Sequence, residues 1–136
     1  MRDVAYVALG SNLGDRGAYL ALGREGLAAL PRSRLRAVSS IEETEPLGPI
    51  PQGLYLNQMA ALETDLVPEE LLDALHAIER SAGRGPGARW GPRTLDLDIV
   101  LYERQSVATD RLVIPHPELA RRDFWRRELA ELRGGV

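Results

Sequence analysis

The sequence has no cysteine. This absence excludes a disulfide framework, a zinc–thiolate site, an iron–sulfur cluster and a cysteine nucleophile. Only two histidines are present, His76 and His116, which is too few for a histidine-rich metal site. No apolar run approaches the ~20 residues that a membrane span needs, and the first residues lead into a strand-like segment instead of a signal-peptide core. We therefore expect a cytoplasmic protein that makes no membrane contact.

Lysine is also absent, since all 17 basic residues are arginine. This excludes the P-loop lysine, the strand lysine of protein kinases and a Schiff-base lysine. Codon bias explains the composition as a whole more simply than function does, but any phosphate bound here has to be bound by arginine. The net charge of −3 argues against a general nucleic-acid-binding surface, which is usually basic.

The length of 136 residues, with 44% hydrophobic side chains, predicts one domain covering residues 1–136. Two stretches rich in proline and glycine, 45–53 and 83–92, interrupt the regular patterns. The hydrophobic periodicity predicts strands over 3–9, 35–45, 55–64, 94–102 and 112–114, helices over 15–30 and 68–81, and a short charged helical end. This order indicates an α+β fold with the ferredoxin-like split βαβ arrangement and a largely antiparallel sheet. A doubly wound parallel sheet fits less well, because two clear helices separate at least four strands.

The sharpest motif is Asp96-Leu-Asp98 within the last long strand. Because strand side chains alternate, Leu95, Leu97, Ile99 and Leu101 should enter the core and the two aspartates should share the other face, about 7 Å apart at their backbones. Val100 and Tyr102 should continue that second face. Two carboxylates so placed suit Mg²⁺, although an exposed strand face that happens to carry two acids would look the same.

An arginine cluster precedes this motif. Arg80, Arg84, Arg89 and Arg93 occur in fourteen residues, with no acidic residue between Glu79 and Asp96. Arginine binds phosphate in bidentate fashion and stays charged at any working pH. Taken alone, the cluster is equally consistent with a solvated basic loop. Beside two carboxylates, it favours a site for a polyphosphate that carries Mg²⁺.

Several further side chains are candidates for ligand contacts, although each is also consistent with ordinary packing. Trp90 lies between glycine and proline residues and is suited to close over a flat ligand. His116, between two prolines, is suited to donate or accept a hydrogen bond. Tyr55, Asn57 and Phe124 are suited to a heteroaromatic pocket. His76 falls on a polar helix face with Asp73 and Arg80, and we interpret it as solvated.

Five segments occur in one order along nearly the whole chain: Val7-Ala-Leu-Gly-Ser-Asn-Leu-Gly14, Thr44-Glu-Pro-Leu-Gly48, Tyr55-Leu-Asn57, Arg89-Trp-Gly-Pro-Arg-Thr-Leu-Asp-Leu-Asp-Ile99 and Ile114-Pro-His-Pro117. Together they closely resemble the 6-hydroxymethyl-7,8-dihydropterin pyrophosphokinases of folate biosynthesis. The resemblance implies a ferredoxin-like α+β fold with three functional loops. It also implies transfer of the β,γ-diphosphate of ATP to the hydroxymethyl group of the pterin, with release of AMP.

The resemblance also implies roles for particular residues. Two Mg²⁺ ions would bind Asp96 and Asp98, and catalysis would involve these two with Arg84 and Arg93. The ATP contacts implied are Glu79, Arg84, Arg89, Arg93, Ile99, Arg111 and His116. The pterin contacts implied are Thr44, Leu47, Tyr55, Asn57, Trp90, Asp96, Arg122 and Phe124. A monomer with ATP and the pterin as its only partners is expected.

The residues themselves leave other readings open. One is a non-catalytic ferredoxin-like module that binds RNA, although the sequence pI of about 5.4 and a carboxylate pair on the strand face argue against it. Another is a nucleotide sensor, which would bind ATP without releasing AMP. If the chain is an enzyme, residues 83–91 should form a lid that becomes ordered when both substrates are bound. This segment has four glycines and no large aliphatic side chain.

Overall fold

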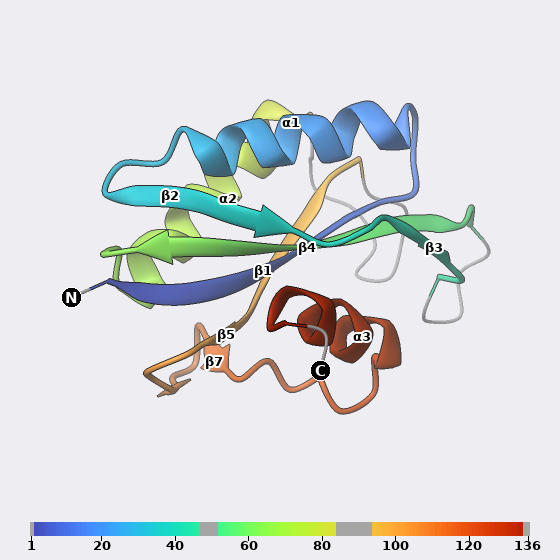
Figure 1. The fold of residues 1–136 in the computed structure, drawn as a ribbon. Coiled ribbons are helices and arrows are strands. Elements are labelled where there is room, and N and C mark those ends of the chain that lie inside the picture. The colour runs from blue at the N-terminus through green and yellow to red at the C-terminus, as the bar shows by residue number, and fades with distance from the viewer. Residues whose placement is uncertain (1, 47–51, 84–93, 135–136) are drawn as a thin grey trace.

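The structure is a computed structural model that describes residues 2–46, 52–83 and 94–134. Helices and strands alternate along the chain in the order typical of an α+β fold (Figure 1). In chain order they are β1 (Asp3–Ser11), α1 (Arg16–Ala28), β2 (Ser33–Val38), β3 (Glu42–Thr44), β4 (Tyr55–Thr64), α2 (Pro68–Ser81), β5 (Asp96–Tyr102), β6 (Val107–Ala108), β7 (Val113–Ile114) and α3 (Asp123–Leu132).

The main sheet has the strand order β2-β4-β1-β5, and every neighbouring pair is antiparallel. The short strand β3 also pairs with β4, and β6 pairs with β7 in a separate ribbon. The order places β1 in the interior of the sheet, which explains why it is apolar on both faces. Two crossovers, one through α1 and one through α2, are interleaved in the manner of the split βαβ unit, so the predicted ferredoxin-like arrangement is confirmed.

The helices lie on both faces of this sheet. Figure 1 shows α1 and α2 on one face and α3 on the other. On the first face, Leu9 of β1 packs so closely against α1 that a Cβ on Gly23 would lie 2.9 Å from Leu9 Cδ2. Leu20, Leu71 and Leu75 are fully buried there, and each such side chain contributes roughly 1.5–3 kcal/mol to folding by its burial.

The predicted strand over 35–45 is wrong in one respect, because it is two strands. The ladder between β2 and β4 ends at Val38, and at the next position the Met59 N–H donates to the Ser39 hydroxyl at 2.9 Å instead of to a backbone carbonyl. A serine side chain that replaces a backbone acceptor interrupts a β-ladder. Pairing with β4 resumes at Glu42 as β3.

The predicted alternation of β5 also fails at one residue. The register to β1 runs from Leu97 opposite Leu9 to Ile99 opposite Val7, and then shifts so that Leu101 lies opposite Tyr6. Val100 is therefore a bulge, and a bulge reverses the faces of the residues beyond it. Leu101 shares the face of the two aspartates and Tyr102 the opposite face, the reverse of the expectation for both residues.

Candidate functional site

Asp96 and Asp98 lie on the face of β5 that looks toward α3, as the alternation predicts. Leu95 and Leu97 are buried on the opposite face, and both aspartates are half-buried. Across the strand pair, Asp98 lies opposite Ala8 and Asp96 opposite Gly10. Ala8 has a small side chain and Gly10 has none, so β1 places no bulky side chain beside the two carboxylates.

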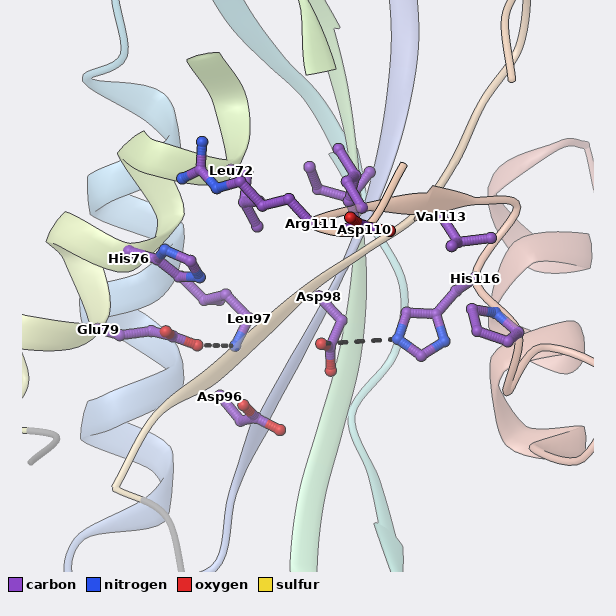
Figure 2. Close-up of a pocket in the computed structure, with 13 residues that line it drawn as sticks. Leu72, His76, Glu79, Asp96, Leu97, Asp98, Asp110, Arg111, Val113 and His116 are labelled. Atoms are coloured by element: carbon purple, nitrogen blue, oxygen red, sulfur yellow. Dashed lines mark hydrogen bonds and ion pairs between the residues drawn. The ribbon is translucent and has the colours of Figure 1, made fainter. Parts of the chain in front are cut away.

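The outer edge of β5 is covered by α2. The Leu97 N–H, between the two aspartates, donates to the Glu79 carboxylate at 2.8 Å (Figure 2). Glu79 is only 5% exposed, so this contact fixes the end of α2 against the start of β5. Glu79, one of the predicted ATP contacts, therefore also holds α2 against β5.

His116 faces Asp98 from the other side. Its backbone N–H donates to the carbonyl of Val100 at 2.8 Å, so the bulge in β5 also provides the anchor for the histidine. Nδ1 accepts a hydrogen bond from the Glu118 N–H at 3.0 Å, which leaves Nε2 directed at Asp98 Oδ1, 3.9 Å away (Figure 2). Burial, assisted by Arg122, lowers the pKa of His116. At neutral pH the ring is thus uncharged and its proton is on Nε2, facing the aspartate.

A pocket of roughly 330 Å³ extends from these residues. Its walls are α2, β5 and residues 110–117, and it includes the predicted ATP contacts Glu79, Ile99, Arg111 and His116 together with both aspartates. The sequence interpretation missed seven further lining residues: Leu72, His76, Leu97, Asp110, Leu112, Val113 and Pro117. His76, interpreted as solvated, is exposed as expected, and it also lines this pocket. His76 comes four residues after Leu72 and three before Glu79, so all three lie on one face of a helix. This spacing is the sequence pattern that could have placed them in one site.

Arg111 is held over this pocket by α2. Its guanidinium donates to Glu69 Oε2 at 3.1 Å and also to Asp73. The contact with Asp73, followed by that with Glu69, raises the pKa of Arg111. The two acids therefore orient an arginine that is itself predicted to contact ATP.

We expect Asp73→Ala to raise KM for ATP up to about fivefold, as for the loss of other exposed ion pairs, and to leave KM for the second substrate unchanged. Steady-state kinetics with each substrate varied in turn measure the effect. Asp65→Ala is the control, because it removes another exposed acid, which pairs with Arg2 at 3.5 Å and does not line the pocket. An equal change in both KM values would show that Asp73 acts only through stability.

The predicted pterin contacts that the structure describes come from two places, the strands β3 and β4 and the beginning of α3. Thr44 and Asn57 are joined by a hydrogen bond from the amide to the hydroxyl, and Tyr55 lies across from Thr44 on the neighbouring strand. Asn57 lies opposite Gly10, which in turn lies opposite Asp96. A Cβ on Gly10 would approach the Tyr55 ring to 3.3 Å, so glycine permits the ring to lie beside Asn57.

Arg122 and Phe124 come from the beginning of α3. The Arg122 guanidinium stacks over the ring of Trp125 at 4.5 Å, and the same indole meets the His116 ring edge-on, with centroids 5.0 Å apart. Trp125 is 2% exposed. Sequence reasoning did not assign it to the site, yet it supports one predicted pterin contact and one predicted ATP contact.

Five predicted site residues lie outside the described residues: Leu47, Arg84, Arg89, Trp90 and Arg93. The expected lid over 83–91 lies outside them as well, apart from Gly83. Their assignment rests on the sequence.

The described geometry defines a class: an α+β protein of ferredoxin-like topology whose small-ligand pocket ends at a pair of carboxylates. The family model that matches residues 6–134 is that of 7,8-dihydro-6-hydroxymethylpterin-pyrophosphokinase, HPPK. The chain belongs to this family, and it is accordingly an ATP-dependent pyrophosphokinase of folate biosynthesis. The reading as a non-catalytic binding module finds no support.

Three relatives carry the name 2-amino-4-hydroxy-6-hydroxymethyldihydropteridine pyrophosphokinase. The protein of Bacillus subtilis is 44% identical over 135 residues, covering 97% of this chain and 79% of the relative. The protein of Pseudomonas aeruginosa is 46% identical over 127 residues, covering 93% and 78%. The protein of Methylorubrum extorquens is 43% identical over 128 residues, covering 94% and 81%. Among the described residues, no helix has the length and apolar character of a membrane span.

Proposed function

We propose that this chain transfers the β,γ-diphosphate of ATP to the hydroxymethyl oxygen of 6-hydroxymethyl-7,8-dihydropterin and releases AMP. The observation that carries the proposal is the position of Asp96. Asp96 lines the pocket that holds the predicted ATP contacts. Only Gly10 of β1 separates it from Asn57 of β4, which is one of the predicted pterin contacts. A diphosphate of ATP bound beside Asp96 and Asp98 would therefore lie between the proposed nucleoside site and the proposed pterin site.

The donor set fits Mg²⁺. Among the described residues, no group of three or more histidine, cysteine or acidic side chains converges as a complete metal site. Two carboxylates on one strand face are nevertheless the usual protein share of a Mg²⁺ site whose remaining ligands are substrate phosphates and water. Asp96 and Asp98 would hold the two ions that we propose. Bound there, Mg²⁺ would neutralise phosphate charge and lower the pKa of a coordinated hydroxyl group.

In the proposed reaction, the pterin oxygen forms a bond to the β-phosphorus of ATP while the bond from that phosphorus to the α,β-bridging oxygen breaks. AMP leaves with the bridging oxygen, and the hydroxymethyl proton is released. The chain itself supplies position and charge. Holding two reactants in line contributes up to roughly 7–11 kcal/mol to lowering such a barrier. Arg111 and the neutral His116, with its proton on Nε2, would donate to ATP, and Arg84, Arg89 and Arg93 would stabilise the phosphate charge.

The pterin would be recognised on the other side of Asp96. The hydroxyl of Thr44 and the amide of Asn57 supply donors and acceptors for a heteroaromatic ring, while Tyr55 and Phe124 supply ring faces. Leu47, Trp90 and Arg122 complete the set that we propose. The monomeric state and the cytoplasmic location remain predictions.

The proposal is tested by AMP formation in the presence of ATP, Mg²⁺ and the pterin. We expect one AMP for each pterin consumed, and no AMP when the pterin or Mg²⁺ is omitted. ATP binding without AMP release would favour a nucleotide sensor instead. AMP release that does not depend on the pterin would make the chain a hydrolase.

A further inference from the structure

Helix α3 buries a carboxyl group against a second carboxyl group. Glu128 is 2% exposed and faces Glu42 of β3. Neither oxygen of Glu128 has an N–H or O–H donor among the described residues, and Oε2 of Glu42 also lacks one. Buried acceptors without a donor are rare and unfavourable, so the pair needs a source of hydrogen-bond donation.

A proton between the two groups resolves this conflict. Two ionised carboxylates in contact would repel each other and would both have lost their water, whereas one neutral carboxyl group can donate to its ionised neighbour. Arg127 identifies the ionised member, because its Nε and Nη2 donate to Glu42 Oε1 at 3.2 and 2.9 Å. Glu128 is then the protonated member.

The charges around the pair agree with this assignment. Burial, followed by the contact with Glu42, raises the pKa of Glu128 to about 9. Arg127 opposes that shift and Glu131 adds to it. Burial also acts to raise the pKa of Glu42, but the hydrogen bonds from Glu128 and Arg127 outweigh it and lower that pKa, against the charge of Asp123. On β4, the other strand against α3, Glu63 is engaged elsewhere by Arg34 at 2.8 Å.

We propose that Glu128 is a positioning residue that stays protonated at neutral pH and, by donating to Glu42, fastens α3 to β3. The neighbouring contacts show why this matters for position. One turn further along α3, Glu131 accepts from the backbone N–H and the hydroxyl of Ser40 at 2.7 and 2.8 Å. Glu128 thus lies beside the point where the helix holds the connection into β3.

The functional part of this inference rests on the proposed function. Glu42 lies opposite Asn57 and two residues before Thr44 on the same strand face, and Phe124 lies one helical turn before Glu128. The buried proton therefore sets the distance between the α3 and β3 sides of the proposed pterin pocket. The nucleotide pocket takes no lining residue from β3 or α3, so an effect on pterin binding is expected to exceed any effect on ATP binding.

The first test measures the unfolding free energy of the whole chain as a function of pH. Between about 4.5 and 9 the folded state holds a proton on Glu128 that the unfolded state releases, so this group makes stability fall as pH rises, with a slope approaching one proton. Glu128→Gln keeps a donor but cannot ionise. It should remove that slope and gain stability relative to the parent as pH rises. Glu25→Gln, at an exposed position of α1, is the control.

Parallel stability curves for the parent and Glu128→Gln would overturn the proposal. Should the variant fail to fold, the infrared carbonyl band of a protonated carboxyl group at pH 7 tests the parent directly, with ¹³C labelling of glutamate to assign it. The absence of that band would contradict the proposal.

The second test measures KM for the pterin against pH. In the parent we expect KM to rise above about pH 9 with a smaller change in kcat, and in Glu128→Gln to stay flat. Glu128→Ala, which lacks the donor, should raise KM several-fold at every pH. If KM for the pterin in the parent did not change with pH although the stability slope was present, the positioning role would be overturned and the protonation of Glu128 would stand. No turnover of the pterin by a chain that shows the stability slope would instead contradict the proposed function.

Discussion

Asp96→Ala and Asp98→Ala are each expected to abolish diphosphate transfer while the fold remains intact. Both side chains are half-buried, opposite Ala8 and Gly10 of β1, and neither belongs to the apolar core. Each substitution removes a proposed Mg²⁺ ligand at the point where the two substrates meet. Chelation of the metal should give the same loss, and added Mg²⁺ should restore the activity of the parent.

The measurement is kcat with saturating ATP and pterin, beside the thermal unfolding curve of each variant. Asp65→Ala, with its exposed carboxylate near Arg2, controls for the loss of one acid and should retain the parent rate. If either site variant kept more than about a tenth of the parent rate, a loss below ~1.4 kcal/mol, the proposed role of the two carboxylates would be wrong.

Arg93→Ala and Arg89→Ala are expected to lower kcat by about 10²–10³ each, the usual effect of removing a charge that stabilises a transition state. The chain has no lysine, so arginine is the only permanently positive side chain that can act on the departing AMP and the transferred diphosphate. Both residues lie outside the described structure, and the expectation rests on their place in the sequence motif. The pterin affinity should change much less than kcat.

Arg80→Ala is the matched control for these variants. Arg80 belongs to the same arginine-rich stretch, but it is exposed at the end of α2 and does not line the pocket. Its substitution should leave kcat near the parent value. A change in Arg93→Ala or Arg89→Ala that was confined to KM for the pterin would move these arginines to the pterin side of the site.

Much of this arrangement follows from periodicity that is visible in the sequence. The helix over Pro68–Ser81 has the predicted bounds because its apolar stripe and its proline and acidic start agree with one another. The strand over Tyr55–Thr64 also has the predicted bounds. Strand alternation likewise places Asp96 and Asp98 on one face. These features depend on residues close together in the sequence, and local patterns report them well.

The remaining features depend on contacts between distant segments. The bulge at Val100 has no local signature, since it is fixed by pairing with β1 and by the His116 N–H. The α3 sequence is highly charged and indicates a solvated helix, yet Trp125 and Glu128 are almost completely buried. Only the packing of α3 against the sheet shows that one supports His116 and the other faces Glu42.

The most direct test of the central claim follows the phosphorus atoms of ATP. ATP labelled in turn at the α, β and γ positions is incubated with the chain, Mg²⁺ and the pterin, and the products are separated. We expect the α label entirely in AMP, and the β and γ labels together in the pterin product in equal amounts. Transfer of the γ label alone with formation of ADP, or release of label without its appearance in the pterin, would contradict the account.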